Sequence, residues 1–202
     1  MAADELIEAL RAGRPVLLPT DTVYGLAVSA EHERDAEGLY RLKGRRHEQP
    51  VALIAASIDE LFDRLPELRE GSGPIVRALL PGPFTLVLPN PARRLPWLTG
   101  ERPETIGVRV PQLAGDARRV LDAVGCVAAT SANDPGGPDP VSLGDVPARI
   151  RAGCAAELDV GRLPGIASTV LDFTGLEPRV LREGAAPSAE ALERVRAIHE
   201  GE

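Results

Sequence analysis

Polar side chains interrupt an apolar segment near the start of the sequence, and they are of the kinds that bind ligands. In PTDTVYGL, residues 19–26, Thr20, Asp21 and Thr22 directly follow the apolar run at residues 16–18. Hydroxyl groups and a carboxylate beyond a strand end can line a ligand site in a layered α/β protein. The same residue types also close turns, so this motif alone leaves both interpretations open.

Two further polar groups stand beside predicted strands. TSAN places Ser131 and Asn133 after the apolar run at residues 126–130, and Ser168 opens the run STVLDF. Side chains at such positions can converge on one crevice. Turn formation is the ordinary alternative, because Ser-Ala-Asn precedes the turn-forming Asp-Pro-Gly-Gly-Pro.

Arg109 lies inside an apolar run, between Val108 and Val110. It either occupies the solvated face of an edge strand or contacts an anion, because a buried charge without a partner is costly. A guanidinium group suits bidentate binding of a carboxylate or a phosphate. The residue is therefore a candidate for anion binding.

The run YRLKGRRH, residues 40–47, gathers Lys43, Arg45, Arg46 and His47 directly after a predicted helix. Basic residues at a helix C-terminus complement the helix dipole, and that is the ordinary interpretation. The functional alternative is a clamp that holds phosphate groups.

Hydrophobic periodicity predicts the elements that must position these residues. Helices are predicted over residues 4–12, 33–43, 58–65, 75–80, 116–124, 143–151 and from 188. Strands are predicted over residues 16–18, 26–29, 51–55, 84–88, 105–110, 126–130, 168–173 and 179–182. Two pairs of successive strands are joined by short turns, so a layered α/β (α+β) domain with a mixed sheet is expected.

Length and composition indicate one ordinary globular domain over residues 1–202. The sequence is 44% hydrophobic and 26% charged, and its net charge of −7 argues against a protein that coats nucleic acid. The N-terminus lacks the pattern of a signal peptide, so a cytoplasmic protein without membrane contact is expected. Proline and glycine gather at residues 89–103 and 135–147, which indicates long loops.

Common metal and nucleotide motifs are missing from the sequence. There is no HExxH, Walker loop or GxGxxG, and the three histidines are scattered. Cys126 and Cys154 have no neighbouring metal-ligand residues, so they are interpreted as small apolar residues rather than as ligands.

Seven motifs taken together resemble the YrdC-like family of threonylcarbamoyl-AMP synthases, in its short stand-alone type. They occur in the family's order and approximate spacing, and they extend from about Pro15 to Gly184: PTDTVYGL, LKGR followed by proline, PGPFTLVL, TIGVRVP, TSAN, ASTVLDF and VLREG. The resemblance implies a three-layer domain in which helices flank a twisted mixed sheet around a large pocket.

The same resemblance implies an activity. Family members combine L-threonine, bicarbonate and ATP into threonylcarbamoyl-AMP and pyrophosphate, which makes them nucleotidyltransferases that serve the modification of certain tRNAs. It also implies Mg²⁺ with the ATP, and tRNA or a tRNA-modification transferase complex as a partner. No covalent nucleophile is needed, because positioning and electrostatics can promote the phosphoryl-type transfer.

Residue roles follow from the resemblance one position at a time. Lys43 and Arg45 correspond to the family's catalytic basic pair on the ATP phosphates. The remaining correspondences are ATP-binding roles for Ser131, Asn133 and Arg182, and threonine-binding roles for Thr22, Arg109 and Ser168. No residue corresponds to the proton acceptor for the threonine amine.

Two residues depart from the family pattern: Arg46 stands where proline usually follows Lys-x-Arg, and Gln49 where some members have asparagine. Two other functions stay open. One is an RNA-binding or ribosome-associated factor of the same fold, with Lys43 to Arg46 and Arg93-Arg94 lining a basic concavity. The other is a YciO-like relative with altered chemistry, although the Lys-x-Arg and Ser-x-Asn patterns are both kept.

Overall fold

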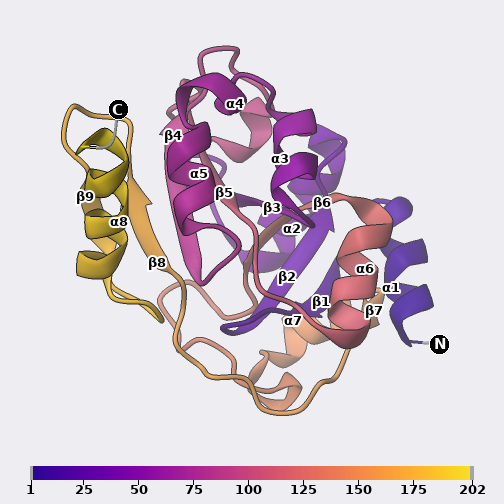
Figure 1. The fold of residues 1–202 in the computed structure, drawn as a ribbon. Helices are drawn as coiled ribbons and strands as arrows, with labels where there is room; N and C mark the ends of the chain where they lie inside the picture. The colour runs from indigo at the N-terminus through magenta and orange to yellow at the C-terminus, as the bar shows by residue number, and fades with distance from the viewer. Residues whose placement is uncertain (1, 201–202) are drawn as a thin grey trace.

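The strands form one mixed sheet in the computed structural model, which describes residues 2–200 and the side chains of residues 2–198. The strands are β1 (Val16–Pro19), β2 (Tyr24–Ser29), β3 (Ala52–Ala55), β4 (Phe84–Pro89), β5 (Thr105–Arg109), β6 (Cys126–Ser131), β7 (Ala156–Glu157), β8 (Thr169–Asp172) and β9 (Arg179–Arg182). Their order across the sheet is β7-β1-β2-β6-β3-β5-β4-β8-β9 (Figure 1).

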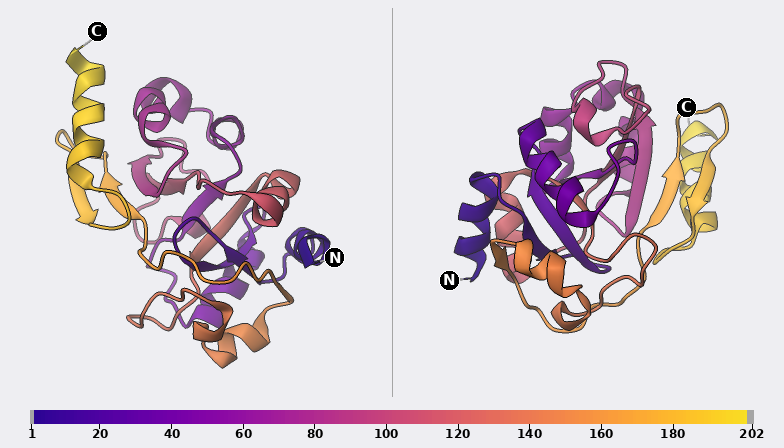
Figure 2. Two further views of the ribbon diagram at one scale, coloured as in Figure 1. Left: turned by 60° about the horizontal axis from the view of Figure 1, so that its bottom comes forward. Right: turned by 180° about the vertical axis from the view of Figure 1, so that it is seen from behind.

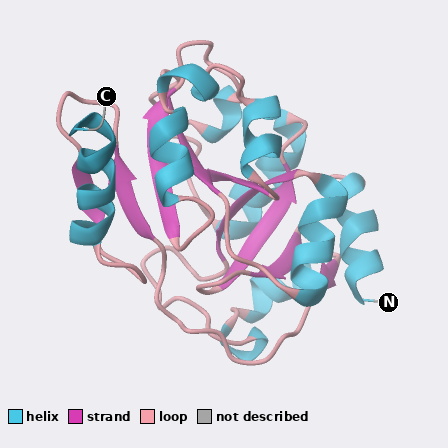
Figure 3. Cartoon of the chain, in the orientation of Figure 1, coloured by secondary structure: helices cyan, strands magenta, loops and turns pink. Residues whose placement is uncertain are grey.

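Helices flank this sheet (Figure 3). They are α1 (Ala2–Arg11), α2 (Glu33–Lys43), α3 (Ile58–Arg64), α4 (Leu68–Gly71), α5 (Gly73–Leu79), α6 (Gly115–Val124), α7 (Ala148–Gly153) and α8 (Ser188–Glu200), with 3₁₀ turns η1 (Pro96–Leu98) and η2 (Leu143–Asp145). No helix in this described part of the chain is long and apolar enough to cross a bilayer.

The two strand pairs joined by short turns are antiparallel, as predicted. β1 pairs with β2 and β8 pairs with β9, whereas β3 pairs with β5 in parallel and β4 with β8 in parallel. The first hairpin is closed by Thr20, whose hydroxyl donates to the Val23 carbonyl at 2.7 Å and accepts from the Val23 N–H at 3.2 Å. One polar residue of the opening motif is therefore explained by turn formation.

Alternation along the strands divides the sheet into two faces. On one face Tyr24, Leu53, Leu86 and Val108 belong to the larger buried cluster, which continues through α2, α3, α5, α7 and α8. On the other face a smaller cluster joins β1, β2, β3 and β6 to α1 and α6. Both views of Figure 2 show α1 and α6 together at one side of the sheet and α8 at the other. The cluster on the second face is thus confined to β1, β2, β3 and β6, and it does not extend over β4, β5, β8 and β9.

The segment predicted as one helix over 143–151 contains two elements, η2 and α7. Pro147 lies between them, has no N–H to donate, and caps the start of α7. The helix predicted to stop at Gly44 does so, because Gly44 adopts the left-handed conformation at φ 67°. The sequence patterns missed α4 and β7, which are only four and two residues long.

Candidate active site

A hollow of about 450 Å³ lies on the second face of the sheet. The residues that line it alternate along the strands, as expected for one face: β5 contributes Thr105, Gly107 and Arg109, and β4 contributes Thr85 and Val87. Two loops close one rim, because the N–H of Glu101 donates to the carbonyl of Glu48 at 3.3 Å. The strands thus form the floor of the cavity, and the two loops form part of its rim.

Strand register arranges the floor of this cavity in three rows. The first row holds Arg109 and Thr85. It continues to the edge strand β9, because Thr85 pairs with Val170 on β8 and Val170 pairs with Arg182 on β9. The middle row holds Gly107, which pairs with Val87, and Ala52, which pairs with Ala129. The third row includes Gly25, which pairs with Ser131. Successive rows lie ~7 Å apart along the strands.

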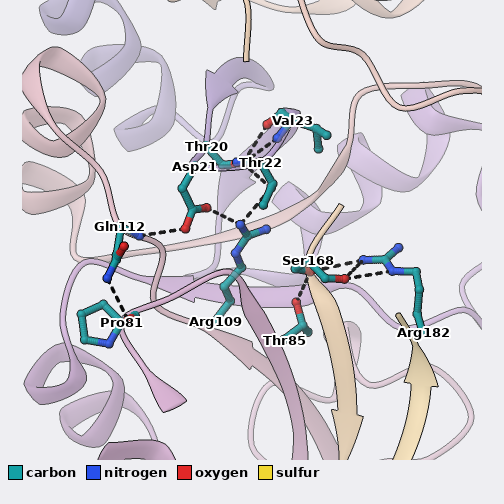
Figure 4. A network of polar contacts seen from close by, with 10 residues as sticks. All are labelled: Thr20, Asp21, Thr22, Val23, Pro81, Thr85, Arg109, Gln112, Ser168 and Arg182. Atoms are coloured by element: carbon teal, nitrogen blue, oxygen red, sulfur yellow. Dashed lines mark hydrogen bonds and ion pairs between the residues drawn. The ribbon is translucent and has the colours of Figure 1, made fainter. Parts of the chain in front are cut away.

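Arg109 contacts an anion that the protein itself supplies. Its Nη2 donates to the Asp21 carboxylate and, at 2.9 Å, to the Thr22 hydroxyl, while the backbone N–H of Gln112 donates to Asp21 at 3.0 Å (Figure 4). Burial lowers the pKa of the guanidinium, and the Asp21 charge opposes that shift. Nε of Arg109 is buried without a partner, and Nη1 makes no hydrogen bond to the described side chains, so part of the guanidinium is unengaged.

Ser168 joins the edge strand to the floor. Its hydroxyl lies 2.8 Å from that of Thr85, and its carbonyl accepts from Nε and Nη2 of Arg182 at 3.1 and 2.9 Å (Figure 4). Arg109, Ser168 and Arg182 all line the same hollow. These predicted residues, which are distant in sequence, come together in the structure.

Arg45 lines the hollow beside β6 and the segment that precedes β3. Its guanidinium donates to the Pro50 carbonyl at 2.7 Å and to the Thr130 hydroxyl at 3.4 Å, and Nε is buried without a partner. Burial lowers the pKa of this group as well. Arginine nevertheless stays protonated at neutral pH, so Arg45 is a second cation beside the hollow.

Lys43 is buried beneath this end of the cavity and is absent from its lining. Its ammonium group donates to the Ser131 carbonyl at 2.6 Å and to the backbone and side-chain oxygens of Asn133. Burial lowers the pKa of Lys43 to about 8. Asn133 also accepts from the Ser131 hydroxyl at 2.7 Å. Lys43 therefore holds the TSAN turn, and Ser131 is the member of this group that lines the cavity.

The sequence analysis overlooked several residues of this site. Thr85 and Arg102 line the hollow and were not proposed, and Thr20 lines it although only Thr22 of its motif was given a binding role; the predicted Thr22 and Asn133 are not part of the lining. Thr85 could have been found from alternation in PGPFTLVL, because it occupies the face opposite Phe84 and Leu86. No local pattern distinguishes Thr20 from Thr22.

The lining carries four arginines and two glutamates, although the whole chain has a net charge of −7. A cationic hollow in an acidic protein favours a small anionic ligand over an extended nucleic acid. Arg93 and Arg94 do not line it, and Arg94 pairs with Glu67 at 2.9 Å. The basic concavity expected for an RNA-binding protein is therefore not assembled from those residues.

A protein-built metal cage does not accompany this hollow. Within residues 2–198 no three His, Cys, Asp or Glu side chains are grouped so as to hold a metal ion. The two carboxylates of the lining, Glu48 and Glu101, stand on the loop-built rim.

Comparison with known proteins relates this geometry to a family. The sequence model of the Sua5/YciO/YrdC family, described as "Telomere recombination", matches residues 8–184. The chain belongs to that family. A Mycobacterium tuberculosis relative with the provisional name of a threonylcarbamoyl-AMP synthase is 35% identical over 179 residues, covering 88% of this chain and 82% of the relative. The Pyrococcus abyssi threonylcarbamoyl-AMP synthase is 32% identical over 187 residues, or 92% of this chain and 54% of that protein.

Solved structures agree with the family assignment. Pyrococcus abyssi Sua5 complexed with L-threonine superposes with a TM-score of 0.83 and 31% identity, covering 94% of this chain and 56% of the other. Escherichia coli YciO gives a TM-score of 0.76 and 25% identity, covering 92% and 90%. The chain thus spans little more than half of the Pyrococcus protein. The predicted mixed α/β fold is confirmed.

Proposed function

We propose that this protein is an L-threonylcarbamoyladenylate synthase, a nucleotidyltransferase that joins L-threonine, bicarbonate and ATP and releases pyrophosphate. The observation that carries the proposal is that Arg45, Arg109 and Arg182 line one hollow, where Arg109 and Arg182 are grouped around Thr85 and Ser168 and Arg45 contacts Pro50 and Thr130. Two separated cationic ends can hold a carboxylate and a polyphosphate at the same time. The names of the relatives support the same activity.

The amino-acid carboxylate belongs to the Arg109 end in this proposal. Asp21 and Thr22 engage Nη2 of the guanidinium, which leaves Nη1 to donate toward the ligand. Ser168 and Thr85 add hydroxyl groups next to the same position. Thr22 acts through Arg109, because its hydroxyl accepts from Nη2 rather than lining the hollow.

The ATP phosphates belong to the Arg45 end. Arg45 and Ser131 face the hollow there, and Lys43 fixes the turn that carries Ser131 and Asn133. The family resemblance also assigns Arg182 to the nucleotide, and Arg182 contacts Ser168 beside the Arg109 end of the hollow, so in this proposal it faces the junction of nucleotide and threonine. Mg²⁺ arrives with ATP as part of the substrate and neutralises phosphate charge.

The reaction joins the two ends. The threonine amine adds to bicarbonate with loss of water to give a carbamate, whose oxygen attacks the α-phosphorus of ATP. A new oxygen–phosphorus bond forms as the bond to the departing pyrophosphate breaks. The cationic groups hold both anions in reach and stabilise the charge that builds on the phosphoryl oxygens. The product supplies tRNA modification, which makes the cytoplasm and a tRNA-modifying transferase the natural setting and partner.

A substrate-omission assay tests the proposal. Purified protein with ATP, L-threonine, bicarbonate and Mg²⁺ should release pyrophosphate, and omission of threonine or bicarbonate should abolish the release. Arg45→Ala should reduce the rate, because one phosphate-binding cation is lost. Arg118→Ala is the matched control, since Arg118 pairs with Asp122 on α6 and does not line the hollow. Equal pyrophosphate release without threonine would reject the assignment and favour altered, YciO-like chemistry.

A further inference from the structure

Gly107 occupies a position at which neither the backbone nor the packing requires glycine. It lies in the interior of β5, where glycine weakens a strand because it has no side chain to pack. Its φ is outside the left-handed region. The conformational freedom of glycine therefore does not explain this residue.

Space for a side chain is present at this position. A Cβ atom on Gly107 would have the Ala52 Cα at 3.9 Å and the Thr85 Cγ2 at 4.0 Å as its nearest neighbours. Both distances are ordinary van der Waals contacts. By contrast, a Cβ on Gly184 would lie 2.3 Å from a backbone oxygen. Alanine at 107 would thus fit the folded protein, and the missing methyl group leaves room only in the hollow.

The location of Gly107 indicates what this room is for. It lies in the middle row of the floor, next to Ala52, which pairs with Ala129. Arg109 lies two residues further along the same face of β5, and Ser131 lies two residues from Ala129 along β6. Ala52, Gly107 and Ala129 therefore form a stretch of small side chains between the strand positions of Arg109 and Ser131, and Val87 continues the row toward β4. A ligand that contacts both Arg109 and Ser131 lies over this stretch in the proposed arrangement.

We propose that Gly107 is a specificity-determining residue that admits the segment connecting the carboxylate of the ligand to its phosphate. The proposal rests on the proposed function, in which this segment is the carbamate. A carbamate is planar for the same reason as a peptide bond, so it can lie flat against a strand that carries no side chain. Glycine at 107 lets the strand backbone approach the ligand closely.

The proposal predicts a selective defect in Gly107→Ala. L-threonine alone and ATP alone occupy one end each, so their dissociation constants by calorimetry should change less than about threefold, below the roughly tenfold lower limit for one added methylene in a pocket. The kcat/KM for pyrophosphate release should fall about 10- to 200-fold, the effect of one misplaced methyl group in a pocket. Gly107→Val should lower it further, because the obstruction is larger.

Gly71→Ala is the matched control, because a Cβ there meets no atom within 4 Å and Gly71 lies in α4, away from the hollow. Melting temperatures establish that each variant is folded. A folded Gly107→Ala protein with wild-type kcat/KM, or one that loses threonine and ATP binding together with activity, would overturn the proposal. Failure of the proposed function has a different signature, since the wild-type protein would then release no threonine-dependent pyrophosphate.

Discussion

Arg109 shows how a buried charge can be stabilised inside the protein and still bind a ligand. Removing it from water is costly, and Asp21 compensates with a carboxylate that is itself fixed by the N–H of Gln112. Only part of the guanidinium is engaged in this way. The internal partner thus orients the arginine while the rest of its donors remain for a substrate carboxylate.

Arg109→Lys separates these two roles. Lysine keeps a positive charge for Asp21 but loses the planar set of donors that a carboxylate engages in bidentate fashion. We expect threonine affinity to fall by about 2 kcal/mol or more, as when a buried charge contact is truncated, while the protein stays folded. Calorimetry with L-threonine measures this, and Arg118→Lys on the surface is the control. Unchanged affinity would show that Arg109 serves only the ion pair with Asp21.

Lys43 should make activity depend on pH. It is the sole lysine of the sequence, and its ammonium group has three hydrogens for three oxygen acceptors. Its pKa is lowered from 10.5 to about 8, mainly by burial and then by the charge of Arg45, with Arg149 adding a smaller lowering effect and Asp139 and Asp134 opposing the shift. Below that pKa the lysine is charged and the TSAN turn is held. Above it the neutral amine has too few donors for the three oxygens.

The expected result is that kcat/KM for ATP stays level below pH 8 and declines as the pH rises through about 8. Bound phosphate raises the pKa of a neighbouring ammonium group, so the decline in kcat should occur at a higher pH. Lys43→Met should have low activity without this decline. If kcat/KM declined with rising pH in Lys43→Met just as it does in the wild type, the titrating group would be a residue other than Lys43.

At the scale of elements, the β8–β9 hairpin forms one side of the hollow, because Val170, Leu181 and Arg182 line it. Arg182 on β9 contacts Ser168, which precedes β8, and Gly184 packs directly against that backbone. The N–H of Ala185 donates to the Ala167 carbonyl at 2.8 Å. The position of Ser168 at the cavity therefore depends on close approach of the two segments.

Gly184→Ala should disturb both stability and binding. A Cβ there would lie 2.3 Å from the Ala167 oxygen and 2.5 Å from the Ser168 carbon, which are backbone atoms that cannot rotate away. We expect the free energy of unfolding to fall by about 1–3 kcal/mol, as for overpacking, with weaker threonine binding. Denaturant melts and calorimetry measure these quantities. Gly175→Ala, with its nearest atom at 3.6 Å, is the control, and equal stability of both variants would contradict the close packing.

Helices and strands could be predicted from the sequence where a single local feature, such as a terminating glycine or a regular alternation of apolar residues, determines the structure. Gly44 ended α2 and alternating apolar residues marked β4, because each pattern is local. Pro147 was present in the sequence, but its effect was underestimated within an otherwise helical pattern. The two-residue strand β7 exists only because β1 offers it a partner, so no local pattern could reveal it.

At the scale of the whole molecule, the topology creates the site. Crossovers place β6 between β2 and β3, and β5 between β3 and β4, which brings TSAN and Arg109 to one face. The sequence analysis could nominate Arg45, Arg109, Ser131, Ser168 and Arg182 from residue type and family resemblance. It could not tell lining residues from supporting ones, because the side on which Thr20, Thr22 or Lys43 lies is decided by pairing between distant strands.

The cavity joins two cationic ends across a floor of small residues, and its chemistry is best tested by identifying the product. Wild-type protein given ¹³C-labelled bicarbonate, L-threonine and ATP should yield an adenylate whose mass includes threonine and the labelled carbon. The same adenylate should be missing when threonine is omitted. Pyrophosphate release accompanied by an adenylate that lacks the labelled carbon would contradict the account.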